Sequence, residues 1–556
     1  MDRVTFDFKL HDRYQVQVKF NFPLRKEQAR QRVRLETYLF LPGNLDINSD
    51  TYGRDTFYRD FTSLTRYEVP VLTLEQILDP HEAFSPLFRL KKILDELRVT
   101  KMPHAFDAQT RWVYELRVLG CIVRERIHEH VRSMGERFEA PFGHAAWNRE
   151  WLAENFSAIE SHLKHVEAIE NEVRTLKREY LAFAREKHDV EAIGFLDEAL
   201  SIELQRACAR VSMFITRAQQ LGAPLSGSGV SGAGGDPDAA ALLKRLGEAY
   251  RSEESYRAEC GYPSSLESDR GPLEQRTNEH LIYRQGMLKK YCQDVLQLSA
   301  FVQQGSKSLQ TLLNALAAML AMAVFLVVVY FVQHKLPADS ILYIALPVFA
   351  YAIKDRVKET LKLVFAKRAT GILRDREAEL IDRGTVPLTV GRAFEVFGFA
   401  AEKYLPEDIR KARARGSMAD FIDSGRPEQI LRHEKEMAVR VDRVFQRHQR
   451  VNRICEIYRL SLRHMLFRMD EPYEKIDVLK TDVESGETRP DTMDALKVYH
   501  ANLVLKVSAQ DELGQWTSQL RKYRLVLSRD GIARFETSEQ TMMPVKISGT
   551  AREHTS

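Results

Sequence analysis

Apolar and polar positions alternate with a period of two at both ends of the chain. Near the start the alternation covers 4–10, 14–22 and 33–41, and near the end it returns at 499–507 and 523–535. Arg529-Asp530-Gly531 is placed as a hairpin turn between two of the late runs. A period of two is typical of strands that bury one face. The pattern therefore predicts one small antiparallel β module at each end of the chain.

Between these ends the apolar spacing changes to three and four residues. Over 147–221 this spacing predicts two long helices that pack as a coiled-coil-like hairpin. From Leu288 to Leu312 it predicts a helical stalk that continues without a break into an apolar segment. From Met437 to Met469 it alternates steps of four and three, which predicts one long helix. A strand over 454–466 is the alternative there, because apolar positions in that stretch also alternate.

A long apolar run predicts a membrane anchor. Leu312 to Val332 is 21 residues long with Asn314 as its only strongly polar member, and as a helix it spans about 31 Å. A second run, Ile341 to Ile353, has 13 residues and contains Pro347, so a re-entrant or interfacial segment is the alternative to a second span. The basic residues expected at the membrane interface are Lys354, Arg356 and Lys358. Because basic residues flank both runs, the positive-inside rule places both termini in the cytoplasm, at the cell inner membrane.

These patterns together predict an α+β membrane protein. A two-helix transmembrane hairpin is flanked by cytoplasmic parts, each of which combines long coiled-coil-like helices with a small antiparallel β module. The expected segments are a β module at 1–75, a helical part at 76–146, the helical hairpin at 147–221, a flexible Gly/Ser linker at 222–237, a helical stalk at 238–311, the transmembrane hairpin at 312–353, a basic juxtamembrane helical region at 354–426, a long Arg-rich helix at 427–469 and a β module at 470–556.

Composition narrows the class of protein. A mean hydropathy of −0.35 excludes a polytopic transporter, and a formal net charge of +4 is too small for the whole chain to bind a polyanion. The five cysteines include no CxxC pair, so they predict neither a disulfide framework nor a zinc finger and fit a reducing compartment. The sequence contains no phosphate-binding GxxxxGK[ST], no HExxH and no GxSxG motif. We therefore expect no cofactor and favour a protein that is not an enzyme.

The Arg-rich segment contains a candidate surface for an anionic partner. Arg440, Arg443, Arg447 and Arg450 are spaced by three and four residues, which on a helix forms one stripe. Such a stripe binds anionic lipid or, less favoured here, nucleic acid. The preferred alternative is pairing with an acidic helix of the same chain or of another subunit, and a solvated face is the third. The hairpin offers glutamates for such pairing, namely Glu160, Glu167, Glu170, Glu172 and Glu179.

A second candidate surface is the loop that follows the first strands. Its Tyr52, Arg54, Asp55, Tyr58 and Arg59 have the composition of recognition surfaces. A loop docked by internal ion pairs has the same composition, and the sequence does not separate the two.

The histidines give weaker indications. His162 and His165 have the spacing of helical metal ligands, but they need further ligands from another helix, so polar positions beside the helical seam are favoured. No metal site is therefore expected.

The function predicted from the sequence is that of a membrane-anchored scaffold or signal-coupling protein that faces the cytoplasm. It is expected to act through protein–protein contacts, with the bilayer as one partner and a second copy or another protein, bound through the helical seams, as the other. The alternatives are a membrane-perturbing effector triggered from the cytoplasm and a membrane-tethered enzyme without a local sequence signature.

Overall fold

The structure is a computed structural model of the whole chain. The residues that it describes are 4–100, 106–138, 149–182, 187–220, 237–262, 273–304, 307–335, 337, 340–369, 374–384, 387–414, 428–481, 488–510, 515–537 and 542–543. The predicted Gly/Ser linker at 222–237 lies almost entirely outside them.

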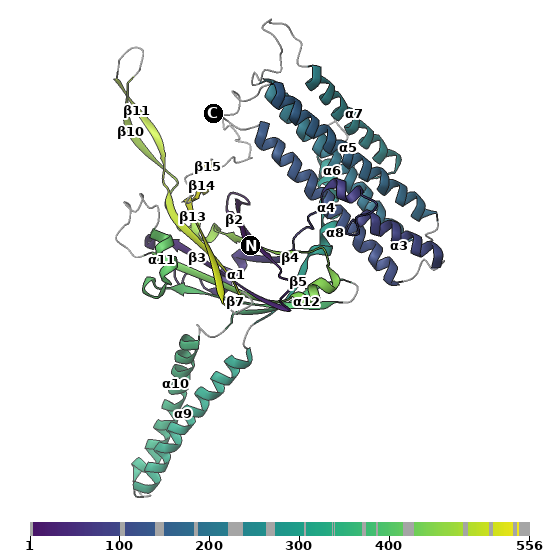
Figure 1. Cartoon of the computed structure of the whole chain (residues 1–556). Helices are drawn as coiled ribbons and strands as arrows, with labels where there is room; N and C mark the ends of the chain where they lie inside the picture. Colours follow the sequence, from purple (N-terminus) through teal and green to yellow (C-terminus); the bar gives the residue numbers. More distant parts are fainter. Residues whose placement is uncertain are drawn as a thin grey trace.

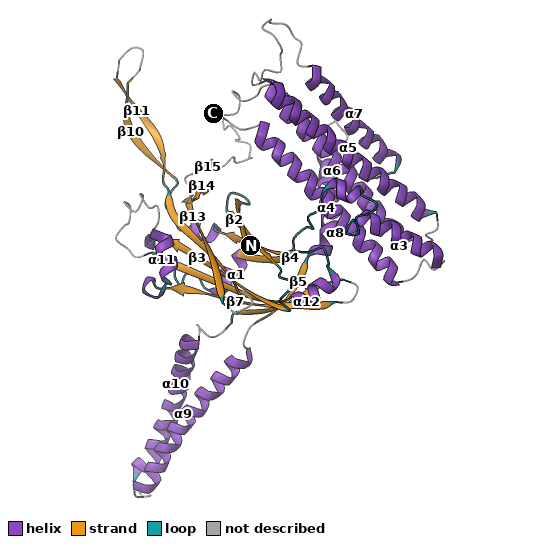
Figure 2. Ribbon diagram, viewed as in Figure 1, coloured by secondary structure: helices purple, strands orange, loops and turns teal. Residues whose placement is uncertain are grey.

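Two antiparallel sheets face each other and form a sandwich (Figures 1 and 2). The smaller sheet has the order β1-β2-β9-β4, and its strands are β1 (Thr5–Leu10), β2 (Gln15–Pro23), β9 (Arg453–Ser461) and β4 (Phe61–Tyr67). The larger sheet has the order β15-β14-β13-β12-β3-β8-β7-β6-β5. Its strands are β3 (Arg30–Leu41), β5 (Leu298–Gln304), β6 (Arg376–Asp382), β7 (Leu388–Ala400), β8 (Gln429–Arg440), β12 (Tyr499–Gln510), β13 (Trp516–Ser528), β14 (Gly531–Thr537) and β15 (Met542–Met543).

The two ends of the chain build this sandwich together. β3 lies between β12 and β8, so that Leu39 has Leu503 on one side and Leu431 on the other. β9 lies between β2 and β4 in the same way. The prediction of a separate β module at each end was therefore wrong. The alternation identified these strands, but pairing between strands hundreds of residues apart leaves no local pattern.

Helices between β4 and β5 form a bundle beside the sandwich (Figure 2). They are α2 (Leu74–Leu78), α3 (Pro86–Thr100), α4 (Phe106–Phe138), α5 (Arg149–Leu181), α6 (Lys187–Gln220), α7 (Pro237–Glu259) and α8 (Leu273–Gln293). Their apolar faces share one core that includes the stacked rings of Trp112 and Tyr180, whose centroids are 4.7 Å apart. Helices α5 and α6 cover the predicted hairpin, and they pack against α3, α4 and α7 rather than only against each other.

A pair of apolar helices projects from the sandwich as an arm, which we define as α9 (Lys307–Lys335) and α10 (Ile341–Ala369) (Figure 1). Among the described residues only α9, over Thr311–Lys335, is long and apolar enough to cross a membrane. The predicted two-helix transmembrane hairpin was therefore wrong. The physical reason is the charged turn that begins at Lys354 and interrupts α10 after 13 apolar residues.

Two further helical predictions were also wrong. The stalk is broken, because η3 (Asp294–Leu296) follows α8 and residues 298–304 then form the edge strand β5, which pairs with β6 along its whole length. The long Arg-rich helix is replaced by β8, α12 (Val441–Arg447), β9 and α13 (Arg463–Leu466). In β8 alternate residues are buried. Residues four apart therefore lie on the same face of this strand, as they also do on a helix, and the spacing was misinterpreted as helical. The strand alternative for 454–466 is confirmed over 454–461, which belongs to β9, and is wrong for 463–466, which forms α13.

The region after the arm also differs from its prediction. Residues 354–426 were expected to be helical, but they contain β6 and β7 as well as η4 (Glu402–Tyr404) and α11 (Glu407–Ala414). A two-stranded ribbon, β10 (Tyr473–Thr481) with β11 (Thr488–Leu496), projects from the sandwich on the other side from the arm (Figure 1). η1 (Gly43–Leu45) and α1 (Arg54–Asp60) follow β3.

Substitution by alanine is expected to have different effects on stability at two glycines of β7. A Cβ at Gly391 would lie 2.7 Å from the carbonyl oxygen of Ala438 on β8, whereas a Cβ at Gly398 would meet nothing within 4 Å. We expect Gly391→Ala to lower the free energy of unfolding by about 1–3 kcal/mol, because the two backbones must separate. Gly398→Ala is the matched control and is expected to be neutral or stabilising. Chemical denaturation of both variants measures the difference, and equal stabilities would contradict the close β7–β8 approach.

Candidate functional site at the base of the apolar arm

The arm exposes a large apolar surface. Its most apolar window is only 17% buried, although its mean hydropathy is 2.8. Side chains that are at least half exposed occur on both helices, and they include Leu312, Met319, Val324, Leu326, Val327, Tyr330, Phe331, Ile341, Leu342, Ile344, Val348, Phe349 and Tyr351. An apolar surface of this extent on a soluble protein marks a contact with lipid or with another protein.

Contacts between the two helices fix how they are aligned. The rings of Phe325 on α9 and Tyr351 on α10 are 5.9 Å apart, and Val324, Phe325 and Lys354 line the same cavity of about 230 Å³. The ammonium group of Lys354 lies 3.8 Å from the centroid of the Tyr351 ring. The charged turn of α10, with the predicted interface residues Lys354, Arg356 and Lys358, therefore lies beside the middle of α9. Only the outer half of the arm is apolar on both helices.

Both ends of the arm join the same edge of the large sheet. β5 leads into α9, and α10 returns the chain to β6, where Gln304 is the partner of Arg376. Asp375, just before β6, accepts a hydrogen bond of 2.6 Å from the backbone N–H of Phe397 and lies 2.8 Å from the guanidinium group of Arg54. Burial raises the pKa of Asp375, and both contacts act against that rise. These contacts fix the point where the chain leaves the arm.

The predicted recognition loop forms part of this attachment. It is the helix α1, on which the Tyr58 hydroxyl donates to Asp375 over 3.4 Å and the Tyr58 ring lies 3.9 Å from the guanidinium of Arg376. The Tyr52 hydroxyl donates to Asp60 over 3.0 Å, and Arg59 donates to Thr56 over 3.3 Å. Asp55 is in the exposed first turn. This arrangement is the docked loop of the second alternative, and a recognition role for it stays a prediction.

Charged residues lie between the two sheets, beneath α1. The ammonium of Lys435 on β8 lies 2.7 Å from Glu456 on β9, and both side chains are almost completely buried. Ser63 of β4 donates to the same oxygen of Glu456 over 2.5 Å, and Thr65 donates to the other oxygen over 2.6 Å. Burial disfavours the ammonium, but Glu456 and Glu395 outweigh it and raise the pKa of Lys435. Burial likewise disfavours the Glu395 carboxylate, but the nearby His433 and Lys435 hold its pKa at about 2.

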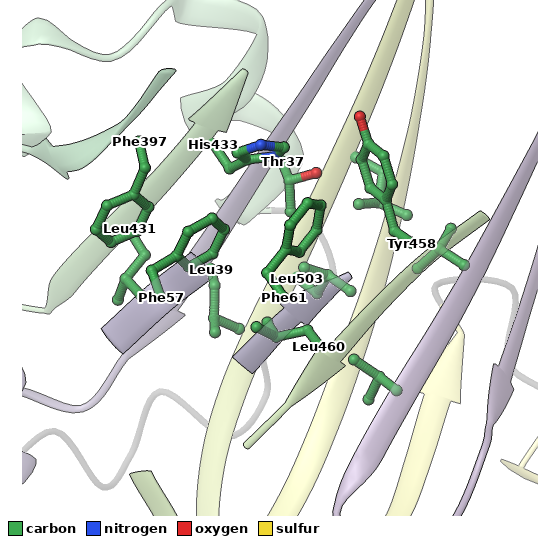
Figure 3. A pocket seen from close by; sticks show the side chains of 13 residues that line it. Thr37, Leu39, Phe57, Phe61, Phe397, Leu431, His433, Tyr458, Leu460 and Leu503 are labelled. Atoms are coloured by element: carbon green, nitrogen blue, oxygen red, sulfur yellow. The ribbon is translucent and has the colours of Figure 1, made fainter. Parts of the chain in front are cut away.

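A small cavity lies next to these charges (Figure 3). Apolar side chains from both sheets and from α1 line it, and its volume is about 30 Å³. Both ring nitrogens of His433 and the hydroxyl of Tyr458 are buried without a hydrogen-bond partner among the described residues. A cavity of this size holds about one water molecule, so it is too small for a substrate.

The charged residues of this interior form ion pairs between the two sheets. The charged groups are paired with one another, and no described group of three or more His, Cys, Asp or Glu could hold a metal ion. The sequence analysis missed Lys435 and Glu456. A signal for Lys435 was present, because it alternates with His433 and Met437, which point into the sandwich.

A second buried polar network joins the sandwich to the bundle. At the end of β6, Asp382 lies 2.6 Å from Nε2 of His448, and the other ring nitrogen of His448 is 2.9 Å from the Tyr114 hydroxyl on α4. Beside them Arg450 donates to both carboxylate oxygens of Glu115 over 2.7 and 2.6 Å. Burial disfavours the Asp382 carboxylate, but His448 and other donors lower its pKa. Since β6 also begins at the arm, one strand connects the arm to the contact with the bundle.

The predicted arginine stripe is divided by this arrangement. Arg440 is on β8, Arg443 and Arg447 are on α12, and Arg450 follows α12. Arg443 donates to the Thr389 carbonyl over 2.9 Å, and Arg447 lies 3.2 Å from Asp382. Pairing within the chain, the preferred alternative, therefore occurs, but with Glu115 of α4 rather than with glutamates of the α5–α6 hairpin. Binding of an anionic partner by the whole stripe stays a prediction.

The bundle places His162 against a histidine of another helix, His130. The rings of His130 on α4 and His162 on α5 are stacked with centroids 4.0 Å apart, and Nε2 of each is buried without a hydrogen-bond partner among the described residues. Burial lowers the pKa of His130 to about 4 and that of His162 to about 3, with further repulsion from Arg137 and His165 respectively. Both rings are therefore neutral at pH 7.

Comparison of the chain with models of protein families, with curated proteins and with solved structures finds no match. The functional argument therefore depends on this geometry.

Removing one partner of the buried Arg450–Glu115 ion pair is expected to lower the stability of the fold strongly. Glu115→Gln leaves the Arg450 guanidinium buried without its carboxylate, so we expect the free energy of unfolding to fall by about 3–5 kcal/mol. The double variant Glu115→Gln/Arg450→Met should recover much of that loss. The exposed pair Arg111–Glu96, at 2.9 Å, is the matched control, and its removal should change stability by about 0.2–1 kcal/mol. Equal effects at the two pairs in urea denaturation would contradict the buried contact.

The stacked histidines predict acid sensitivity of the bundle. Their folded-state pKa values lie below the ordinary value of 6.5, so the unfolded chain binds more protons as the pH falls. Stability is therefore fully present above pH 6.5 and is lost between that pH and about 4, by at most about 1.4 kcal/mol per pH unit for each ring. Thermal unfolding of His130→Gln/His162→Gln should show a weaker pH dependence in this window than the parent. An unchanged slope would show that other groups dominate.

Proposed function

We propose that the protein is anchored in a membrane by its arm and couples movements of its helical bundle to that arm. Its arm lies in a bilayer, its sandwich and bundle lie together on the cytoplasmic side, and the strands β5 and β6 link the arm to the bundle. The observation that supports this proposal is the position of an exposed apolar arm between two hydrogen-bonded neighbours of one sheet.

Lipid is the occupant that best fits the surface of the arm. The apolar residues surround both helices of its outer half rather than forming one stripe, whereas a protein partner usually covers a single face. Tyr330, Tyr343 and Tyr351 are aromatic residues of the kind enriched at membrane interfaces, and Lys354, Arg356 and Lys358 follow the apolar part of α10. On α10 the apolar outer half of the arm is thus followed by residues suited to anionic headgroups.

The charged turn of α10 sets the depth of insertion. Ile341 to Ile353 spans about 20 Å as a helix, which is more than one leaflet and less than the whole hydrocarbon layer of about 30 Å. We place Lys354 near the headgroups and the outer half of the arm in hydrocarbon. Gln333, His334 and Lys335 make the tip polar, and the long Lys335 side chain can extend toward the far headgroups.

The topology supports a single side for all soluble parts. β2, β3 and β4 precede the arm, and their hydrogen-bonded partners β8, β9 and β12 follow it. A membrane cannot pass between strands that share hydrogen bonds. The basic residues next to the arm and the unpaired cysteines favour the cytoplasmic side.

The coupling part of the proposal follows the chain from the bundle to the arm. α8 passes through η3 directly into β5, and the Asp294 carboxylate in η3 is paired with Arg117 of α4 at 3.0 Å. β6 returns from the arm to Asp382, which contacts His448 and through it Tyr114 of the bundle. A displacement of the bundle is thus applied to both strands that hold the arm. Binding of a protein partner or a second copy through helical surfaces stays part of the proposal.

Replacement of the arm tests the anchor. Because Gln304 and Arg376 are paired neighbours, residues 307–369 can be replaced by a short Gly/Ser linker without separating β5 from β6. We expect the full-length chain to float with liposomes that contain anionic lipid, and the shortened chain to stay folded and remain in the aqueous fraction. Flotation of the full chain should survive high salt, because buried apolar surface rather than charge supplies most of the affinity.

Point variants distinguish insertion of the arm from non-specific adsorption of exposed apolar residues to liposomes. Leu320→Asn/Val324→Asn/Val327→Asn changes exposed residues of α9 and should reduce flotation at least tenfold. The matched control, Ile476→Asn/Leu479→Asn/Met493→Asn, removes exposed apolar residues of the β10–β11 ribbon and should leave flotation unchanged. The proposal fails if the full chain is monodisperse without detergent, or if the ribbon variant loses flotation and the α9 variant does not.

A further inference from the structure

The projecting ribbon of β10 and β11 exposes apolar side chains on a sheet of only two strands. In the described part of the chain β10 pairs with β11 and with no other strand. A sheet of two strands is at best marginally stable in water, and a third strand or a packed helix is usually needed. The large apolar side chains of the ribbon are 41% to 73% exposed, and they are Tyr473, Ile476, Leu479, Met493 and Leu496. Exposed apolar residues beside an unpaired strand edge are typical of a place where another strand is added.

The edge of β10 suits an added strand better than the edge of β11. β11 contains Pro490, which has no backbone N–H and is typical of an edge that is protected from pairing. β10 contains no proline, and it is paired with β11 along its whole length from Tyr473 to Thr481. Every second residue of β10 therefore directs its backbone N–H and C=O away from β11, to the open edge.

The sequence of β10 is complementary to itself when two copies of the strand run antiparallel. With a two-fold axis at Ile476, Lys475 of each copy lies opposite Asp477 of the other. In the same alignment Tyr473 lies opposite Leu479, and Ile476 lies opposite Ile476 of the second copy. Neither Lys475 nor Asp477 has an ion-pair partner among the described residues, although other charges of the ribbon are paired. Opposite charges and apolar residues directly across a strand pair stabilise it.

The same alignment joins the exposed apolar residues into continuous rows. Within the ribbon Ile476 lies opposite Met493, and Tyr473 lies opposite Leu496. Residues that lie opposite each other point to the same face of a sheet. Across the four strands of two copies, one face would therefore carry a central row of two isoleucines between two methionines. On the other face, Leu496 and Tyr473 of one copy would continue into Leu479 of the second.

Charge also disfavours the neighbouring registers of the two copies. A shift by two residues moves the axis to Lys475 or to Asp477, and either shift places like charges directly opposite each other. A shift by one residue aligns outward-directed backbone groups of one copy with inward-directed groups of the other, so the strands cannot form hydrogen bonds. The register with its axis at Ile476 is therefore favoured over both kinds of shift.

We propose that β10 is the interface of a homodimer, in which two ribbons form one antiparallel sheet of order β11-β10-β10-β11. The contact is isologous, because the same residues of both copies form it. Antiparallel pairing reverses the direction of the second ribbon, so the second sandwich lies at the tip of the first ribbon. The ribbon and the arm project from opposite sides of the sandwich (Figure 1), so the two arms of the dimer point away from each other. Resting on the proposed function, the dimer thus connects two bilayers.

A charge swap tests the register of the dimer. Sedimentation velocity of the full chain in detergent micelles should show an equilibrium between monomer and dimer that depends on concentration. Lys475→Asp and Asp477→Lys each place like charges opposite one another twice in the dimer, so each should weaken association at least fivefold. The double variant Lys475→Asp/Asp477→Lys restores opposite charges and should associate as the parent does. A dimer formed through the bundle or the arm would not respond to these changes.

Cysteine crosslinking locates the two-fold axis. The variants are made with Cys260→Ser, because Cys260 is the exposed cysteine and the other four are buried. Ile476→Cys should form a disulfide-linked dimer under mild oxidation, since the two Cβ atoms would be about 5 Å apart. Lys480→Cys is the matched control on the same exposed strand. Its two cysteines would be about 26 Å apart in the proposed register and should not crosslink.

Clustering of liposomes tests the opposite directions of the two arms. The parent chain should cluster liposomes that contain anionic lipid, as measured by light scattering, whereas Lys475→Asp should float with them and not cluster them. The homodimer is overturned if the chain is a monomer at every concentration, if the single charge variants associate like the parent, or if Lys480→Cys crosslinks as readily as Ile476→Cys. A dimer that does not float contradicts the anchor alone, and a dimer that floats without clustering contradicts the opposed arms, so the failures are distinguishable.

Discussion

Hydrogen bonds between strands that precede the arm and strands that follow it constrain the whole structure. β3 is bonded on both sides to strands from the C-terminal part, and β9 from that part lies between β2 and β4. The sandwich core therefore forms only when both parts are present, and contacts of such long sequence separation fold slowly. The same constraint keeps the two parts on one side of any membrane. The arm is an insertion at one sheet edge, not a divider between two domains.

The buried charges depend on that arrangement. Lys435 and Glu456 are on β8 and β9, which belong to different sheets, and the two charges meet only when the sheets close over each other. A buried pair adds little to stability compared with an apolar pair of the same shape, but leaving either charge unpaired is very unfavourable. A shift of β8 by two residues would keep Lys435 on the buried face but move it away from Glu456. The pair therefore favours one register of the strand that lies next to β3.

Local patterns in the sequence identified single strands and helices better than they identified which strands pair with each other. Alternation found β1, β2, β3, β12 and β13, and the apolar run from Leu312 to Val332 found α9, because a sheet face and an apolar helix each have a periodic signature. The same reasoning failed at Met437 to Met469, where steps of three and four matched buried positions in β8, α12 and β9 alike. It also failed at Leu298 to Gln304, where pairing with β6 overrides a helical spacing.

The candidate sites were less accessible from the sequence than the elements. Asp375 and Arg54 are more than three hundred residues apart, and so are Tyr114 and His448, so only the strand topology brings the members of each pair together. The loop of Tyr52 to Arg59 was noticed from its composition, yet composition does not separate a docked loop from an exposed one.

The position of the arm gives the bundle contact a mechanical role in the proposed coupling. α8 continues through η3 into β5 and the arm, so a movement of α8 acts on the segment that enters α9. The buried Arg450–Glu115 and His448–Tyr114 contacts hold α4 on the sandwich. Arg284 of α8 donates to the buried carboxylate of Glu198 on α6, so α8 is tied to the same bundle. A movement of the bundle is thus transmitted to the arm through β5 and β6 together.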